Sequence, residues 1–119
     1  MLLVDAANVV GSRPDGWWHD RAGAAGRLVE QLRSAVREER LDPPVLVVLE
    51  GAARPGCPEG TAGGVHVVHA AGSGDDTLHE LARSSEPVTL VSADRELGQR
   101  VRACGADVVG PGWLLDRLA

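Results

Sequence analysis

Carboxylate side chains occur just past short apolar runs at four places in this chain. They are Asp5 in LLVDAANVV, Glu50 in VLVVLEG, Asp75 and Asp76 in GSGDDTLHEL, and Asp94 in VTLVSADREL. In an open parallel α/β sheet the ligand crevice lies outside the carboxyl ends of the strands, so acids placed at those ends converge. Mg²⁺ and Mn²⁺ take oxygen ligands and keep several waters. The pattern therefore predicts a site for a divalent cation.

A helix cap is the alternative explanation for three of these acids. Asp is a favoured residue at helix starts, and Asp75, Asp76 and Asp94 are all expected there. Asp5 differs, because no helix is expected directly after the first apolar run. Since capping leaves Asp5 unexplained, the joint pattern favours a metal site.

The elements that must position these acids follow from hydrophobic periodicity. Short aliphatic runs predict five strands, at residues 2–5, 45–49, 65–68, 88–91 and 108–109. Helical spacing of apolar residues, with caps and breakers, predicts helices at 20–40, 73–83, 94–103 and 111–118. Residues 51–64 have no hydrophobic period and contain several glycines and prolines, so we expect a mobile surface loop there.

This alternation predicts one α/β domain that spans residues 1–119. We expect three layers around a mostly parallel, five-stranded, Rossmann-like sheet of order 3-2-1-4-5. That order makes the first and fourth strands neighbours at the topological switch point. Asp5 should then lie beside Asp94, with Asp75 and Asp76 facing them from the start of a helix.

Charge limits the kind of partner that the chain can attract. The formal net charge of −5 argues against broad attraction to a polyanion, so any contact with nucleic acid must be local. All 12 cationic side chains are Arg, whose guanidinium group binds phosphate in a bidentate way. Solvated helix faces explain most of them, including Arg33, Arg37 and Arg40.

Targeting signals and cysteine spacing add little. The first strand is expected to begin at Leu2, which leaves no room for a signal peptide, and no apolar run approaches the roughly 20 residues that span a bilayer. We expect a cytoplasmic protein without a membrane partner. Cys57 and Cys104 lack the spacing of a zinc or redox pair, and we assign them no role.

Three other phosphate chemistries fit the sequence less well. A phosphatase of the haloacid dehalogenase type needs D-x-D after its first strand, but Asp5 is followed by two alanines. A response-regulator receiver needs an acceptor Asp after its third strand and a Lys, and this chain has neither. A P-loop needs G-K-[ST], which is missing from GSGDD.

Three segments together resemble the NYN branch of the PIN-domain nucleases. They are D-A-A-N at the end of the first strand, G-D-D-x-L at a helix start, and V-S-A-D-R-E-L after the fourth strand. The resemblance covers nearly the whole chain in the same order, and it implies a PIN-like fold. One departure is Glu50, where relatives often have Asp at the end of the second strand.

The resemblance also implies roles for individual residues. Asp5, Asp75, Asp76 and Asp94 would bind one or two Mg²⁺ or Mn²⁺ ions for catalysis, Asn8 would orient a metal-bound water or a phosphate oxygen, and Ser92 would support the site. The implied reaction is metal-assisted hydrolysis of RNA phosphodiester bonds. Which of the two adjacent aspartates is the closer ligand stays open.

Substrate contacts are predicted outside the acidic set. Exposed Trp17 and Trp18 beside Arg21 would stack unpaired bases and contact phosphate. Ser92 and Arg95 are further candidates for binding substrate. The alternative is that one or both indoles cover the edge of the sheet. Single-stranded RNA is the expected partner, and the oligomeric state, with a homodimer as one option, stays open.

Two further points stay open at this level. His79 lies on the helical face of Asp75 and Asp76, where it would hydrogen-bond a ligand carboxylate, or it is simply a satisfied histidine. A catalytically silent module that binds nucleic acid or protein is the alternative to an enzyme. Retention of the full acidic set with Asn8 favours the enzyme, because packed carboxylates without a cation repel one another.

Overall fold

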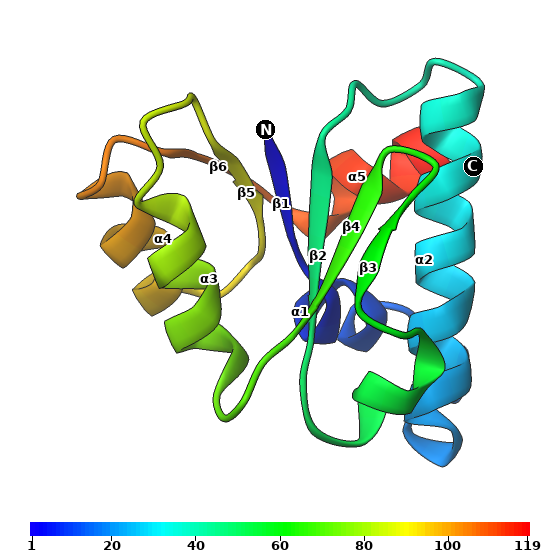
Figure 1. Cartoon of the computed structure of the whole chain (residues 1–119). Coiled ribbons are helices and arrows are strands. Elements are labelled where there is room, and N and C mark those ends of the chain that lie inside the picture. The colour runs from blue at the N-terminus through cyan, green and yellow to red at the C-terminus, as the bar shows by residue number, and fades with distance from the viewer.

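A six-stranded sheet forms the centre of the computed structural model, which describes residues 1–119 (Figure 1). The strands are β1 (Leu2–Asp5), β2 (Val45–Leu49), β3 (Gly60–Ala62), β4 (Val65–His69), β5 (Thr89–Val91) and β6 (Asp107–Val109). Their spatial order is β3-β4-β2-β1-β5-β6. All neighbouring pairs are parallel except β3 and β4. Without β3, the order is the predicted 3-2-1-4-5, so β1 and β5 are neighbours as expected.

Helices cover both faces of the sheet and complete the three layers (Figure 1). Helices α1 (Ala6–Gly11), α2 (Arg21–Arg37) and α5 (Pro111–Leu118) pack on one face, and α3 (Gly74–Ala82) and α4 (Arg95–Arg102) pack on the other. Two 3-10 turns, η1 (Trp17–His19) and η2 (Gly51–Gly56), lie in the connections. The α/β fold class predicted from the sequence is confirmed.

Two aliphatic cores hold these layers together. Successive residues of a strand point to opposite faces, so Val4 joins the core beneath α1, α2 and α5, while Leu3 joins the core beneath α3 and α4. Both side chains are fully buried. Burial on both faces explains why the strands are continuous aliphatic runs rather than alternating ones.

The long helix α2 begins and ends where local sequence chemistry places it. The Asp20 side chain accepts a hydrogen bond of 2.9 Å from the backbone N–H of Gly23 and so caps the first turn. Leu28 and Leu32 recur at helical spacing and are completely buried against the sheet. The helix ends at Arg37, a few residues short of the predicted boundary at residue 40.

Two expectations about the connections are wrong. Helix α1 follows β1 directly, although no helix was expected there; its six residues are too few to show a hydrophobic period, and Val9 alone is a fully buried apolar anchor. Residues 51–64 are not an irregular loop, because they contain η2 and the antiparallel strand β3. Both elements are stabilised by tertiary contacts that local periodicity does not encode.

The segment η2 packs closely on α2 because both contribute glycine at the contact. A methyl group built on Gly56 would lie 2.1 Å from the carbonyl oxygen of Ala22, and one on Gly26 would lie 2.8 Å from the carbonyl oxygen of Gly56. Neither oxygen can move easily, since both belong to the backbone. Glycine at these positions therefore sets how closely η2 approaches the helix.

We expect Gly56→Ala to destabilise the protein by about 1–3 kcal/mol, because the added methyl group forces η2 away from α2. Thermal denaturation of the two proteins measures the difference. Gly112→Ala is the matched control, since a methyl group there meets nothing within 4 Å and Gly112 lies inside α5. An equal loss of stability in the two variants would contradict the close-packing explanation.

Candidate functional site

Asp5 is the most buried acid in the molecule and lies at the carboxyl end of β1, with only 6% of its surface exposed. Its Oδ2 atom accepts a hydrogen bond of 2.8 Å from Ser92 Oγ, and its Oδ1 atom accepts one of 3.3 Å from the backbone N–H of Asn8. Burial of the carboxylate raises the pKa of Asp5, against the opposing effect of these two hydrogen bonds.

Ser92 joins Asp5 to the start of α4. Its hydroxyl donates to Asp5 and accepts a hydrogen bond of 3.1 Å from the backbone N–H of Asp94. Only 3% of Ser92 is exposed, so the hydroxyl acts inside the protein and positions Asp5. We predicted Ser92 both as a support and as a contact for substrate, and its burial suits the first role.

Asp94 has the capping role that was the alternative for it. Its Oδ1 atom accepts a hydrogen bond of 3.0 Å from the backbone N–H of Leu97 at the first turn of α4. Asp5 likewise caps α1, through its bond from Asn8. Capping uses only part of each carboxylate, which offers about four lone-pair sites. The cap therefore leaves acceptor capacity on both acids.

Asn8 connects α1 to the β5–α4 loop. Its Oδ1 atom accepts a hydrogen bond of 2.8 Å from the backbone N–H of Ala93. This bond fixes the orientation of the Asn8 amide, with Oδ1 toward the Ala93 backbone and Nδ2 directed away from it. No protein acceptor lies within hydrogen-bond reach of Nδ2, and these donors are free for an external oxygen.

The two adjacent aspartates of α3 differ in their surroundings. Ser73 caps the helix through a bond of 3.2 Å from the backbone N–H of Asp75, as predicted. Asp75 is half-buried, and desolvation together with the negative charges of Asp94 and Glu50 raises its pKa. Asp76 has a side chain that is 78% exposed and forms an ion pair of 3.2 Å with Arg100. Asp75 therefore belongs to the acidic cluster, while Asp76 points to solvent.

Glu50 also belongs to the cluster, in line with its place among the strand-end acids, although the family resemblance assigned it no role. Its Oε2 atom accepts a hydrogen bond of 2.8 Å from the backbone N–H of Gly74, which ties the end of β2 to the start of α3. A methyl group on Gly74 would lie 3.0 Å from the carboxyl carbon of Glu50, so glycine permits this approach. The strand-end pattern contained the signal, because Glu50 directly follows the second apolar run.

The donor set suits a hard cation, although no three acidic, His or Cys side chains are placed to enclose one. Asp5, Glu50, Asp75 and Asp94 offer only oxygen ligands, and Asp5 is subject to the negative charges of Asp75 and Glu50. Mg²⁺ is usually held by one or two carboxylates plus waters and substrate phosphate, and a closed protein cage is not required. The residues present therefore fit Mg²⁺ or Mn²⁺ as a partly hydrated ion.

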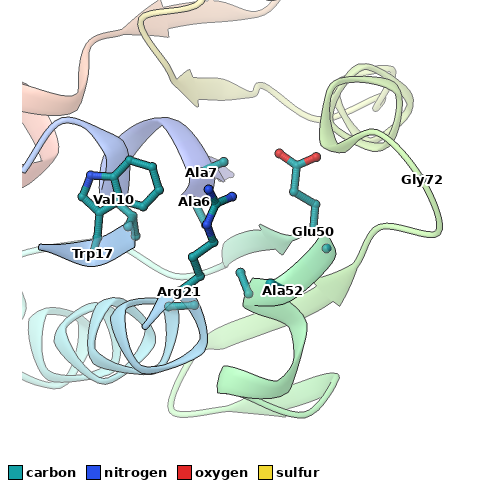
Figure 2. Close-up of a pocket in the computed structure, with 11 residues that line it drawn as sticks. Ala6, Ala7, Val10, Trp17, Arg21, Glu50, Ala52 and Gly72 are labelled. Carbon is teal, nitrogen blue, oxygen red and sulfur yellow. The ribbon is translucent and has the colours of Figure 1, made fainter. Parts of the chain in front are cut away.

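A pocket of about 350 Å³ lies beside these acids (Figure 2). Small apolar residues of α1, α2 and η2 form much of its lining, and Trp17, Arg21 and Glu50 contribute the large side chains. The Arg21 guanidinium carbon lies 5.2 Å from the centroid of the Trp17 ring, in a cation–π contact. Trp17 and Arg21 therefore line one wall of the pocket together.

Other predicted residues lie apart from this pocket. Trp18 is 55% exposed and is absent from the pocket lining. His79 contacts Arg100 at 3.1 Å and Cys104 at 3.5 Å, and it bonds no carboxylate directly. Arg95 is exposed at the first turn of α4, and its role stays a prediction.

Two other histidines, His66 and His69, lie on β4 and are partly exposed. His69 contacts the carbonyl oxygen of Cys57 at 2.7 Å, and His66 contacts the Thr61 hydroxyl. These contacts fasten the end of η2 and strand β3 to β4, which local sequence did not indicate.

The order of strands, the flanking helices and the acids at the carboxyl edge define a three-layer α/β protein with a mostly parallel sheet. Two crystal structures of Rae1 (YacP) from Bacillus subtilis share this fold. The wild-type protein matches with a TM-score of 0.73 over 99% of this chain, and a point variant matches with 0.68 over 98%. Both comparisons cover 72% of the Rae1 chain at 19% sequence identity. The likeness shows the fold.

Comparisons at the level of sequence add no relative. No family model matches the chain, and no curated protein matches it. Within the chain, none of the helices combines the length and apolar character that crossing a membrane requires.

Proposed function

We propose that the chain is a divalent-metal-dependent ribonuclease of the NYN branch of PIN-like proteins. One observation carries the proposal: Asp5 and Asp94 are linked through Ser92 at the switch point of the sheet, and Asp75 and Glu50 face them from neighbouring elements. In folds of this type, ligands bind at that place. The fold shared with Rae1 and the three segments that resemble PIN-domain nucleases support the same function.

Asp5, Asp75 and Asp94 are the residues that would hold Mg²⁺ or Mn²⁺, and the nearby negative charge of Glu50 would add to the attraction for the cation. Asp76 is the weaker candidate, because Arg100 neutralises it at the surface. When bound, the ion would activate a water nucleophile and neutralise charge on the leaving oxygen of the phosphodiester. The other contributions come from side chains of the protein.

Ser92 holds the Asp5 carboxylate in one orientation, and Asn8 offers its free amide donors to a phosphate oxygen or a water. Both groups are fixed by hydrogen bonds across different elements, so they need little reorganisation when substrate binds. Arg21 and Arg95 supply positive charge near an otherwise acidic edge. Because the net charge is −5, RNA must be held by such local contacts.

Single-stranded RNA fits these contacts better than a duplex. Trp17 offers an aromatic surface, and stacking of an unpaired base on such a surface contributes about 1–3 kcal/mol. In a duplex, the faces of the bases are already stacked on one another. The free strand would therefore place one base near Trp17 and a phosphate near the acids.

A silent binding module is the second candidate, and one observation favours it. Asp5, Glu50 and Asp94 already accept hydrogen bonds from the protein, and no three side chains enclose a cation position. Such a module would keep the fold and bind RNA or protein without cleaving it. The two candidate functions differ in whether a bound metal ion leads to cleavage of RNA.

We expect the purified protein to cleave single-stranded RNA slowly in Mn²⁺ or Mg²⁺ and to stop when EDTA is added, because hydrolysis depends on the bound ion. Gel analysis of end-labelled RNAs of several sequences measures the products over time. If none of these RNAs is cleaved in either metal, the result contradicts the ribonuclease hypothesis and favours the binding module.

A further inference from the structure

The pocket beside the acidic cluster contains two opposite charges that do not neutralise each other. Arg21 enters its lining from α2 and Glu50 from the end of β2, and both side chains extend toward the same space (Figure 2). They form no ion pair with each other within 4.0 Å, and neither forms an ion pair with another residue. A cation and an anion that remain separate in one cavity offer complementary groups to a ligand.

The rest of the lining is mostly small and apolar, apart from one aromatic ring. Ala6, Ala7, Ala52 and Ala53 present only methyl groups, and Gly51 and Gly72 present no side chain at all. Trp17 adds the broad surface of an indole. The volume of about 350 Å³ is at the lower end of the range of roughly 300–1,000 Å³ found for small-molecule sites. A planar heterocycle suits this lining better than a flexible chain.

The polar groups narrow the choice of heterocycle. A carboxylate only accepts hydrogen bonds, and a guanidinium only donates them. Guanine presents two adjacent donors, the ring N1–H and the N2 amino group, and it presents the O6 and N7 acceptors on another edge. Adenine and cytosine each offer a single amino donor, and uracil offers a single ring N–H. Guanine alone satisfies a carboxylate with two parallel bonds and also an Arg fork.

We propose that this pocket binds an unpaired guanine of a single-stranded RNA, with Glu50 accepting from the N1–H and N2 donors and Arg21 donating to O6 or N7. Trp17 contacts the base through its ring. The assignment of this base to RNA rests on the proposed ribonuclease function. In that case a cation held by the acids beside the pocket would bind the phosphate next to the guanine.

The Glu50 carboxylate is held in place for this contact with the base. Its bond from the Gly74 backbone holds one carboxylate oxygen, and the remaining lone pairs of the group stay available for a base. The same residue lies close enough to Asp5 and Asp75 for its charge to raise the pKa of both. The guanine would thus lie directly beside the proposed metal site, which makes the base next to the cleaved bond the one that is recognised.

The test measures binding without cleavage. Fluorescently labelled five-nucleotide RNAs of sequence UUGUU, UUAUU, UUCUU and UUUUU are titrated with wild-type protein in EDTA, and with Asp5→Asn in Mg²⁺, while anisotropy is recorded. We expect the guanine RNA to bind about tenfold more tightly than the others. Equal affinity for the four RNAs, or no binding in either condition, would overturn the proposal.

Variants separate the contacts. Glu50→Gln should reduce the preference for guanine about tenfold. Trp17→Ala should weaken the binding of all four RNAs about tenfold. Trp17→Phe retains an aromatic ring and should keep most of the affinity. The matched control is Glu86→Gln, because Glu86 is exposed and lies outside the pocket lining, so this variant should keep the wild-type preference for guanine. Unchanged preference in folded Glu50→Gln would remove Glu50 from recognition.

Two further outcomes keep this inference separate from the proposed function. Cleavage of RNA without any preference for guanine contradicts the pocket assignment and leaves the ribonuclease standing. Guanine-selective binding without cleavage supports the pocket and contradicts the enzyme. Free GMP, used as a competitor, should bind more weakly than UUGUU; equal affinity would indicate a nucleotide site rather than an RNA site and overturn the proposal.

Discussion

Asp5→Asn and Asp94→Asn are each expected to reduce RNA cleavage by about 100-fold or more. A bound metal ion contributes several kcal/mol to the transition state of such a reaction, and about 1.4 kcal/mol corresponds to a factor of ten in rate. Amide groups are poor ligands for Mg²⁺ and Mn²⁺ when they replace the only charged oxygens available. Initial rates of cleavage in Mn²⁺ measure the loss for each variant.

The fold should survive both substitutions, because Asn preserves the caps. Asn and Asp are about equally good at the N-terminus of a helix, so Asp94→Asn still accepts from Leu97 and Asp5→Asn still accepts from Asn8. Asp107→Asn is the matched control. Asp107 is exposed and is the first residue of β6, so it lies at the amino ends of the parallel strands, away from the acids at their carboxyl ends. Cleavage by this variant should therefore be unchanged.

Two results would contradict the assignment of these acids. Equal cleavage by wild type and both variants would point to a contaminating nuclease. Loss of activity together with unfolding would instead assign Asp5 and Asp94 to structure alone, and circular dichroism of the same preparations distinguishes the two cases.

Stabilisation by Mn²⁺ is expected to increase as the pH rises. Burial and neighbouring acids raise the pKa of Asp5 and Asp75 above the ordinary value of about 3.9. The folded protein therefore retains protons there that the unfolded chain has released. The stability that these two acids contribute is full below about pH 3.9 and is lost as the pH rises through their folded pKa values.

A divalent cation reverses this trend, because it binds the ionised carboxylates and must displace any remaining protons. Melting curves in EDTA and in Mn²⁺, recorded from pH 4 to pH 8, measure the difference in Tm. We expect that difference to grow with pH in the wild type and to shrink in Asp5→Asn, while Asp107→Asn behaves as the wild type. A difference that is independent of pH, or absent at every pH, would contradict a metal site built on Asp5.

Much of the fold was predictable because it depends on local patterns. Residues 45–49 form a continuous aliphatic run, which only a strand buried on both faces accommodates well, and the structure has β2 there. Residues 111–118 begin with proline at the first turn and form α5 with the predicted bounds. The preference for right-handed crossovers then leaves few strand orders, and the predicted order of five strands matches the observed one when the additional strand β3 is left out.

The connections were predicted less well, since their structure depends on contacts between distant residues. Strand β3 has three exposed residues and exists because it pairs with β4. The 3-10 turn η2 depends on the approach of Gly56 to α2, which involves residues about thirty positions apart. Helix α1 depends on Asp5 as its cap, and the same residue was interpreted only as a ligand.

The sequence by itself determined which residue types are available for chemistry and at which strand ends and helix starts they lie. Asp5, Asp94 and the pair at residues 75–76 were recognisable because they follow apolar runs that periodicity identifies. Tertiary structure alone decided which of them share an environment. It turned Asp75 inward and paired Asp76 with Arg100, and it joined Glu50, Trp17 and Arg21 in one pocket. The physical reason is that burial and charge coupling depend on distances across the fold, which the order of residues along the chain does not specify.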